Sequence, residues 1–597
     1  EMEWVRAGSR YICGYCRQVN EKFLLRYKFM ERDGVGAFPE LVNDVYEYEY
    51  QRPVSKIIQF VFVIDTSYAF IHSSDYRNMI NAIRCFIDKL LSPSIYFSII
   101  TYNTNLTIYQ FIKGRYSQLV FANLNDSVSE LLVPFYHTLF ANGNNKAAVD
   151  SLLDHLLAIE ELEESIPTSK SGCCFGTALK VANDLLNTKG GSIISICGTR
   201  CTVGQGTIKK RAESTDCYGT ADEQRLLYPD DSNDFYQNIA LNCSNIGTVV
   251  NMLFFETDYM DVATLSEPAH ITSGVLKVYK SNTASLQECV TDVVTCMPSA
   301  VFCAVRLRQP TCVSVEMVGG HLFQKTTTNY AMPVMRRDTS IIFHIVPNRE
   351  IKYSRLHFQF ALSYSALNGA RRTRIFNISV DVTNDKQLLY SGINYQPALM
   401  GLISKLLTGA KERSSLQKAL EASYSDILKM KPHLTADNLL PAYFYGLTQY
   451  QLFNKEPTPV DYRTSLIFQL NNYSNTLFNV LIPILYRVDT PSSIQQVQLS
   501  AAHITANIHI MVRQFVFVIV PSDINTTALQ ECVGCSSLDE VEGIIELKSI
   551  PMRDAIDCVT RLYKLPVVFV VSGTEKYNHF LSNAYIFDRT SPFMQCL

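Results

Sequence analysis

Apolar strands and amphipathic helices alternate over the first half of the chain. The segment from Ile57 to Ile64 is almost entirely apolar, which is typical of a strand covered on both faces. Residues 79–90 repeat apolar side chains every three or four positions, which predicts a helix. Further strands are expected at Ile95–Thr101, Ser192–Ile196 and Thr248–Phe255, and further helices at Thr177–Leu186 and Asp234–Cys243. Strands that alternate with helices indicate a parallel sheet covered on both faces.

The pattern changes twice in the second half of the chain. Short strands separated by turns predict a β-sandwich, and they are expected at Val301–Arg308, Val313–Met317, Ile341–Val346, Leu356–Tyr364 and Arg374–Val382. Between residues 395 and 487 the period becomes helical, and the last hundred residues return to strands and helices, with apolar strands at Phe515–Val520 and Val567–Val571. The chain therefore reads as several domains of different class.

Length and composition agree with a multidomain globular protein. A chain of 597 residues is too long for one hydrophobic core, and a hydrophobic content of 47% with 18% charged residues is outside the disordered range. The net charge of -3 argues against wholesale binding to nucleic acid. No apolar run approaches the roughly 20 residues that a membrane-spanning helix needs, and no secretory signal is visible. Seventeen scattered cysteines favour a reducing, cytosolic setting.

A cysteine pair near the start of the chain has the spacing of one zinc knuckle. Cys13 and Cys16 form a CxxC, in which two thiolates can meet a tetrahedral ion from a tight turn. No second CxxC or histidine pair follows within 30 residues. The spacing alone leaves open a zinc site, a redox pair and two incidental thiols.

The first buried strand ends in a motif that resembles a known metal site. Asp65-Thr66-Ser67-Tyr68-Ala69 follows the strand as the DxSxS motif does in von Willebrand A-type domains, where the carboxylate and hydroxyls coordinate a divalent ion. Ala69 replaces the last hydroxyl, so a strand-ending turn is favoured over a working metal site.

Motifs of common enzymes are absent from the sequence. We find no nucleophile elbow, phosphate loop, dinucleotide fingerprint or zinc-protease helix. Gly204-Gln205-Gly206 lacks the lysine of a phosphate loop and is interpreted as a turn. The histidines, such as His321 and His503, form no pairs with ligand spacing, so isolated surface or capping roles are expected.

Two basic features are candidates for binding. Arg306 and Arg308 lie two apart in a predicted strand, so both guanidinium groups should project from one face and could clamp a carboxylate or an acidic peptide. The alternative is a pair of solvated strand residues. Arg371–Arg374 contains three arginines after the turn Asn368-Gly369, and a basic turn of this kind suits an anionic membrane surface.

Several segments resemble the paired inner-coat subunits of the COPII vesicle coat, and the cargo adaptor more than its GTPase-activating sister. Arg10–Asn20 is similar to the adaptor's aromatic, cysteine knuckle and trailing Val-Asn. The other similar segments are Thr202–Arg211, with its TVGxG loop, Tyr259–Leu265, Leu565–Val571 and Ile586–Thr590, in which Ile-Phe stands where the family usually has Val-Glu.

The resemblance implies a fold class and domain limits. It implies a multidomain α/β protein built on a von Willebrand A-type trunk at 55–297. The other implied domains are a partial zinc ribbon at 1–45, a β-sandwich at 298–388, an all-α helical domain at 389–487 and a gelsolin-like α/β domain at 488–597. The family's first CxxC would fall just before residue 1, so Cys13 and Cys16 would be half of a structural four-cysteine zinc site.

The resemblance also implies a function. The chain would be a non-enzymatic subunit that binds sorting signals of membrane cargo leaving the endoplasmic reticulum for the Golgi, with Arg306 and Arg308 in a pocket for acidic signals. Its partners would be the sister subunit, a Sar-type GTPase, the outer coat and, peripherally, the membrane of the endoplasmic reticulum; no nucleic acid is expected. The alternatives are the GTPase-activating sister itself and a nuclear factor that combines an A-type domain with a zinc ribbon.

Overall fold

The computed structural model describes most of the first 411 residues and shorter stretches after them. The main described ranges are 39–50, 58–90, 94–122, 133–163, 172–211 and 225–411 (without 188 and 257), then 416–434, 440–448, 459–472, 484–490, 493–497, 507–512, 516–541 and 567–574.

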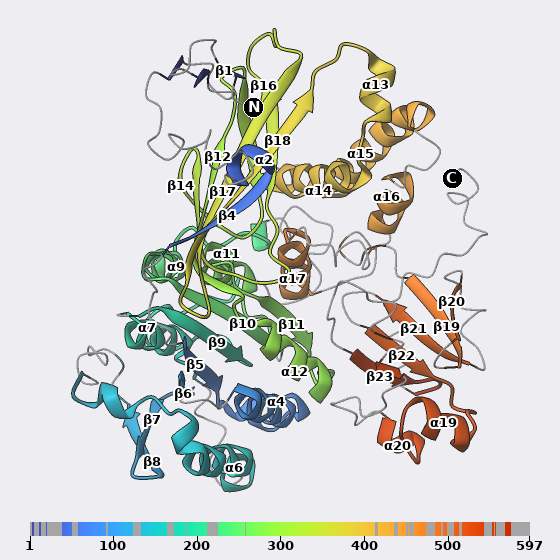
Figure 1. Ribbon diagram of the computed structural model, residues 1–597. Coiled ribbons are helices and arrows are strands. Elements are labelled where there is room, and N and C mark those ends of the chain that lie inside the picture. The colour runs from blue at the N-terminus through green and yellow to red at the C-terminus, as the bar shows by residue number, and fades with distance from the viewer. Residues whose placement is uncertain are drawn as a thin grey trace, which may run out of the picture.

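A seven-stranded sheet forms the trunk (Figure 1). The strands follow the order β11-β10-β9-β5-β6-β7-β8, and the first five are parallel. The parallel strands are β5 (Ile58–Asp65), β6 (Ile95–Tyr102), β9 (Gly191–Cys197), β10 (Thr248–Glu256) and β11 (Leu276–Lys280). The predicted strands of the trunk are therefore confirmed. The antiparallel edge formed by β7 (Leu106–Ile112) and β8 (Arg115–Phe121) was not predicted.

Helices cover both faces of this sheet, as its continuous apolar strands require. One face packs against α4 (Ser74–Leu90), α6 (Lys146–Glu163) and α12 (Leu286–Thr295). The other face packs against α7 (Phe175–Leu185), α9 (Phe235–Ile246) and α11 (Glu267–Ile271). Successive residues of β5 point to opposite faces of the sheet: Phe62 packs in one core and Val63 in the other, and both are fully buried.

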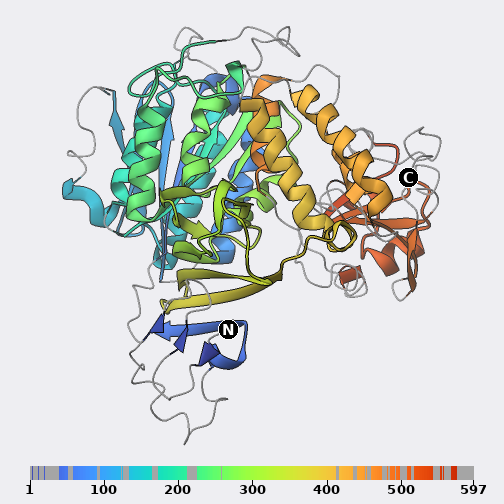
Figure 2. The same ribbon diagram turned by 90° about the horizontal axis from the view of Figure 1, so that it is seen from above.

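The predicted β-sandwich is a six-stranded antiparallel sheet faced by a strand pair. The large sheet has the order β14-β15-β12-β17-β18-β4 and uses β14 (Phe323–Thr326), β15 (Asn329–Met335), β12 (Ala300–Arg308), β17 (Arg355–Ala366) and β18 (Arg371–Asp381). The pair is β13 (Val313–Gly319) with β16 (Ile342–Pro347). The sixth strand, β4 (Val45–Tyr50), precedes the trunk in the sequence and lies against β18 (Figure 2).

Paired charges attach β4 to the sandwich and correct one prediction. Glu47 accepts hydrogen bonds from Arg374 Nε at 2.8 Å and from the Tyr364 hydroxyl at 2.6 Å. Arg372 Nη2 lies 2.9 Å from a carboxylate oxygen of Glu49. The predicted basic turn at Arg371–Arg374 is therefore wrong: these residues lie inside β18, and two of the three guanidinium groups are neutralised by β4 rather than presented to a membrane.

The remaining described residues form a helical part and a small α/β part. The helical period predicted from residue 395 begins with α14 (Tyr395–Lys411), which packs with α15 (Leu416–Met430), α16 (Leu440–Thr448) and α17 (Val460–Leu470). The last sheet has the order β20-β19-β21-β22-β23 and contains β20 (Ser493–Val497), β19 (Ile484–Thr490), β21 (Ile508–Val512), β22 (Val516–Val520) and β23 (Val567–Val571). The domain limit drawn between 487 and 488 falls within β19.

Among the residues that the structure describes, each helix is too short or too polar to cross a membrane.

The β4 ion pairs give a first prediction. Glu47→Gln should lower the free energy of unfolding of the sandwich by about 1–2 kcal/mol, because a partly buried carboxylate with two arginines and a tyrosine loses its charge. Burial alone would raise the pKa of Glu47, but hydrogen bonds from Tyr364 and Arg374 lower it, so this stability should be lost as the pH falls through the ordinary glutamate range.

Glu49→Gln is the matched control for this measurement. Its side chain is 58% exposed against 24% for Glu47, and the expected loss is below about 0.5 kcal/mol. Urea unfolding of the two variants distinguishes the cases, and equal losses would contradict the role given to Glu47.

Candidate functional site

The arginine pair lies on the outer face of the six-stranded sheet. Along β12, Val305 and Leu307 are buried, whereas Arg306 and Arg308 are exposed. The prediction that both guanidinium groups leave the same face is therefore confirmed. Both strand neighbours of β12 contribute small or polar residues beside Arg306, which stands opposite Ala361 of β17 and Asn329 of β15.

No carboxylate neutralises these two arginines within the described part of the chain. Arg308 Nη1 donates to Gln359 Oε1 at 3.0 Å, and Gln359 Nε2 donates to Asn377 Oδ1 at 2.9 Å, so neutral amides orient one guanidinium. Arg306 takes part in no described ion pair. The pair therefore keeps its charge available for an acceptor from outside the chain.

Aromatic side chains stand at the far edge of the same sheet face. Tyr46 and Tyr48 of β4 pack edge to face, with ring centroids 5.5 Å apart, and their strand partners are Ile375 and Thr373. Strands lie about 4.8 Å apart, so three strand spacings separate β4 from β12, or about 14 Å. The outer face thus carries cations at one side and aromatic rings at the other.

The Asp65 loop is closed by protein donors. The side chain is fully buried, and its Oδ1 accepts from the Ser67 backbone N–H at 2.8 Å. Its Oδ2 accepts from the N–H groups of Gly198 and Thr199 and from the Thr199 hydroxyl, at 2.9, 2.8 and 2.8 Å. Burial raises the pKa of Asp65, against these hydrogen bonds. The carboxylate joins the ends of β5 and β9, which is the geometry expected of a strand-ending turn.

The TVGxG loop is also structural. Gly176, at the start of α7, lies so close to this loop that a Cβ there would come within 2.1 Å of the Gln205 carbonyl oxygen. The Gln205 N–H donates to the Thr177 hydroxyl at 3.1 Å. The loop therefore packs on α7, and its glycines form a turn, as expected.

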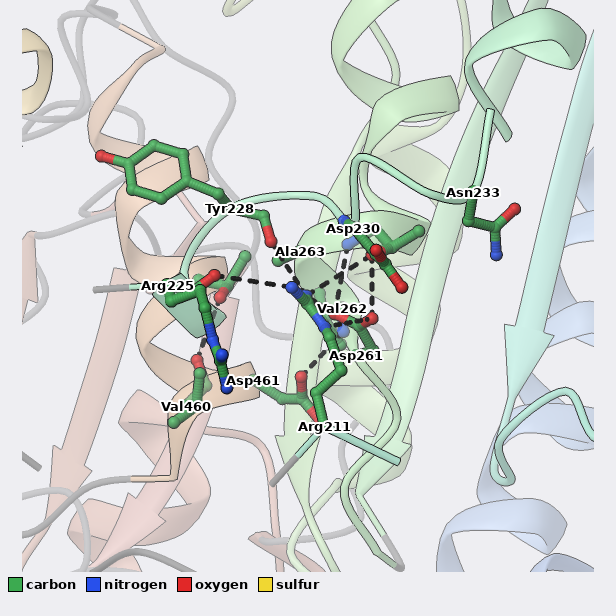
Figure 3. Close-up of polar contacts among 12 residues, drawn as sticks. Arg211, Arg225, Tyr228, Asp230, Asn233, Asp261, Val262, Ala263, Val460 and Asp461 are labelled. Atoms are coloured by element: carbon green, nitrogen blue, oxygen red, sulfur yellow. Dashed lines mark hydrogen bonds and ion pairs between the residues drawn. The ribbon is translucent and has the colours of Figure 1, made fainter. Parts of the chain in front are cut away.

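The basic residues after this loop belong to a polar network shown in Figure 3. Arg211 forms an ion pair with both carboxylate oxygens of Asp261, and its Nη2 donates to the Tyr228 carbonyl at 2.8 Å. Asp261 adopts a left-handed conformation (φ 61°) and caps the short helix α10 (Val262–Leu265). Two segments that resembled the family, Thr202–Arg211 and Tyr259–Leu265, thus meet in space.

Asp461, which the sequence did not single out, connects this network to the helical domain. It is the second residue of α17 and accepts from the backbone N–H groups of Met260 and Val262 at 2.6 and 2.7 Å. Burial raises its pKa to about 7, although these two donors act in the opposite direction. A lone acidic residue in a helical segment offers no sequence signal for a contact about 200 positions away.

One histidine differs from its predicted role. His321 is buried, its Nε2 lies 2.8 Å from the Phe468 carbonyl oxygen, and its Nδ1 lies 2.9 Å from Nδ1 of His270. The expectation of isolated surface histidines is wrong for His321, because three domains meet there. His503 lies outside the described residues.

Cys13 and Cys16 lie outside the described residues. The short strands β2 (Tyr11–Ile12) and β3 (Val19–Asn20) flank them and pair antiparallel. Elsewhere in the described part of the chain, no group of three or more histidine, cysteine or acidic side chains could hold a metal ion. Burial raises the pKa of Cys174 to about 12 and that of Cys303 to about 12, so these thiols pack as small apolar groups.

Comparison with known proteins decides the family. The model of the Sec23/Sec24 trunk domain matches residues 55–291, and the model of the Sec23/Sec24 beta-sandwich domain matches residues 300–383. The two matches together cover more than half of the chain. The chain belongs to the Sec23/Sec24 family.

Relatives within the family carry the Sec24 name. Protein transport protein sec24 of Schizosaccharomyces pombe is 25% identical over 572 residues, which is 89% of this chain and 59% of the relative. Protein transport protein SEC24 of Dictyostelium discoideum is 24% identical over 437 residues, which is 70% of this chain and 42% of the relative. The chain thus spans about half the length of the relatives it matches.

A solved structure of the family has the same fold. The human COPII-coat protein Sec24c superimposes with a TM-score of 0.75 at 19% identity, over 97% of this chain and 82% of that one. The predicted fold class, a multidomain α/β protein with an A-type trunk and a β-sandwich, is confirmed.

Asp461 gives a prediction about pH. Its pKa in the folded chain exceeds the ordinary value near 4, so the folded chain binds the extra proton, and the free energy of unfolding should fall as the pH rises from about 4 to about 7. Asp461→Asn should remove this dependence. It should also cost about 1–3 kcal/mol, because the new NH2 group faces a backbone donor.

Chemical unfolding of both proteins between about pH 4 and about pH 8 measures the effect. Parallel pH profiles for the wild type and the variant would contradict it.

Proposed function

We propose that this chain is the cargo-binding subunit of a COPII coat, which packages membrane cargo into vesicles leaving the endoplasmic reticulum for the Golgi. The supporting observation is the unneutralised pair Arg306 and Arg308 on an open sheet face, whereas the arginines of β18 are held by partners within the chain. The Sec24 names of the relatives favour this function over the alternatives.

The bound group is a carboxylate of an extended sorting signal. Two guanidinium groups on one strand lie about 7 Å apart along it, which suits one or two acidic side chains of a peptide. The neutral amide of Gln359 orients Arg308 without competing for its charge. An apolar residue of the same peptide could rest on Tyr46 and Tyr48 across the sheet.

The partners follow from membership in the coat. We propose pairing with the GTPase-activating sister subunit, contact with a Sar-type GTPase and the outer coat, and peripheral association with the cytoplasmic side of the endoplasmic reticulum membrane. The chain would act by binding and not as an enzyme. A GTP hydrolysis assay separates it from the sister subunit, because strong acceleration by the purified chain alone would assign the activating role to it.

We further propose that Cys13 and Cys16 supply two thiolates of a structural zinc site. The support is their knuckle spacing, the resemblance of the flanking residues to the adaptor's ribbon, and the antiparallel strands on either side. The zinc would brace the fold locally and supply no chemistry.

The cargo proposal is tested with a double variant. Arg306→Ala with Arg308→Ala should weaken binding of an acidic sorting peptide by about 10- to 100-fold, because two charge-assisted contacts are lost. Fluorescence anisotropy with a labelled peptide measures it, and the same peptide with glutamine in place of glutamate should bind both proteins equally weakly. Pairing with the sister subunit should stay intact.

Arg355→Ala is the matched control. Arg355 lies on β17, on the same sheet face, but its Nε donates to Asp381 at 2.8 Å. Its loss should change peptide affinity by less than about twofold. Unchanged affinity in the double variant, or equal losses in both, would refute the cargo proposal.

The zinc proposal is tested by metal analysis. A chain extended upstream by the family's first CxxC should contain one zinc per molecule, and Cys13→Ser with Cys16→Ser should release it and lower thermal stability. A metal-free product with unchanged stability would rule the site out.

A further inference from the structure

The strand that carries the arginine pair is irregular before it reaches them. Ala300 and Cys303 of β12 are both buried, although residues three apart should point to opposite faces of a regular strand. Against β17, Val301 pairs with Ser365 and Ala304 pairs with Ser363. Two residues of β12 therefore oppose one residue of β17, which is a β-bulge.

This extra residue determines where the arginines point. Before the bulge the even-numbered Ala300 faces the core, and after it the odd-numbered Cys303, Val305 and Leu307 do. Without the bulge, Arg306 and Arg308 would share the face of Ala300, which is 2% exposed. The arginines reach the outer face only because the strand holds one residue more than its partner.

The bulged residue is strained and is held by a hydrogen bond. Phe302 has a φ of 52°, in the left-handed region that an aromatic residue rarely adopts. Arg371 Nη1 donates to the Phe302 carbonyl oxygen at 2.8 Å. The same guanidinium group donates to the hydroxyls of Ser365 and Ser363, at 3.1 and 2.8 Å, and these two residues are the partners on either side of the bulge.

The trunk holds the other side of the same residue. Gly247 ends helix α9 in a left-handed conformation, with a φ of 80°. A Cβ at this position would lie 2.0 Å from Cε1 of Phe302 and 2.5 Å from its Cδ1, so the ring rests directly on the glycine backbone. Any residue larger than glycine at position 247 would therefore clash with the Phe302 ring in this position.

We propose that Phe302, Arg371 and Gly247 are positioning residues for the arginine pair: the trunk and Arg371 hold a strained bulge in β12, and the bulge turns Arg306 and Arg308 outward. The binding role of the two arginines rests on the proposed function, whereas the bulge and the contacts that hold it do not. Contact between the trunk and the sandwich would then be a condition for binding acidic signals.

The test compares two glycine variants of the whole chain. Gly247→Ala places a methyl group in the ring's position, whereas Gly114→Ala has nearly the same left-handed φ, 76°, and no atom within 4 Å of the new Cβ. Backbone strain is therefore matched, and only displacement of Phe302 differs. The first readout is the rate of phenylglyoxal modification of Arg306 and Arg308, followed by mass spectrometry, and the second is affinity for the acidic peptide.

Gly247→Ala should slow modification of both arginines by about fivefold or more and weaken peptide binding by at least about tenfold, whereas Gly114→Ala should change neither by more than about twofold. Combining Gly247→Ala with Phe302→Gly should restore both readouts, because glycine adopts the bulge conformation without a ring. Equal behaviour of the two single variants would overturn the proposal.

A third variant keeps the proposal testable if Gly247→Ala does not fold. Arg371→Met removes the hydrogen bond to the bulge without touching the trunk, and it should slow modification of Arg306 and Arg308 in the same way. Normal modification in a folded Arg371→Met protein would overturn the proposal. Absence of peptide binding in the wild type would refute the cargo function alone, since arginine modification needs no peptide.

Discussion

The docking of helix α17 against the trunk and the sandwich is the contact on which the arrangement of three domains depends. Asp461 accepts two trunk backbone N–H groups, Ser465 Oγ accepts from the N–H of Val278 at 3.3 Å, and the Phe468 carbonyl faces His321 of the sandwich. All of these groups are buried, so losing one partner leaves the other unsatisfied, which costs more than the bond itself contributes. In Figure 1, α17 lies above the trunk strand β11 and below α14, so it joins the trunk to the helical domain.

Ion pairs with carboxylates distinguish the structural arginines from Arg306 and Arg308. Arg211 is half of a nearly buried ion pair with Asp261, and Arg372 and Arg374 hold β4 in place, so their charge is used within the chain. Arg306 and Arg308 meet only neutral groups in the described part of the chain, although their types and spacing resemble those of the paired arginines. The number of arginines in a segment therefore does not show whether their charge is available for binding. That depends on whether the neighbouring strand places a carboxylate beside them.

Much of the fold could be predicted because buried strands carry their own signal. The strands β5, β9 and β10 are continuous apolar runs, and α4 shows a clear helical stripe, so element type and order followed from local pattern. The edge strand β8 has only a weak alternation of apolar and polar residues, so it was not predicted. The strand β19 begins at Ile484, within the segment that was predicted to be helical. The strand β4 alternates tyrosine and glutamate, but nothing local shows that it crosses to β18, more than 300 positions later.

The sequence by itself determined the classes of domain, their order and the two arginines on one strand face, because these depend on side-chain period and type within a few residues. Only the tertiary structure decided which charges remain available and which face of β12 they occupy. A bulge changes which residues of a strand face the core because it adds one residue. The groups that stabilise this bulge come from elsewhere: Arg371 from β18 and Gly247 from the trunk. Contacts over such distances leave no pattern in the residues nearby.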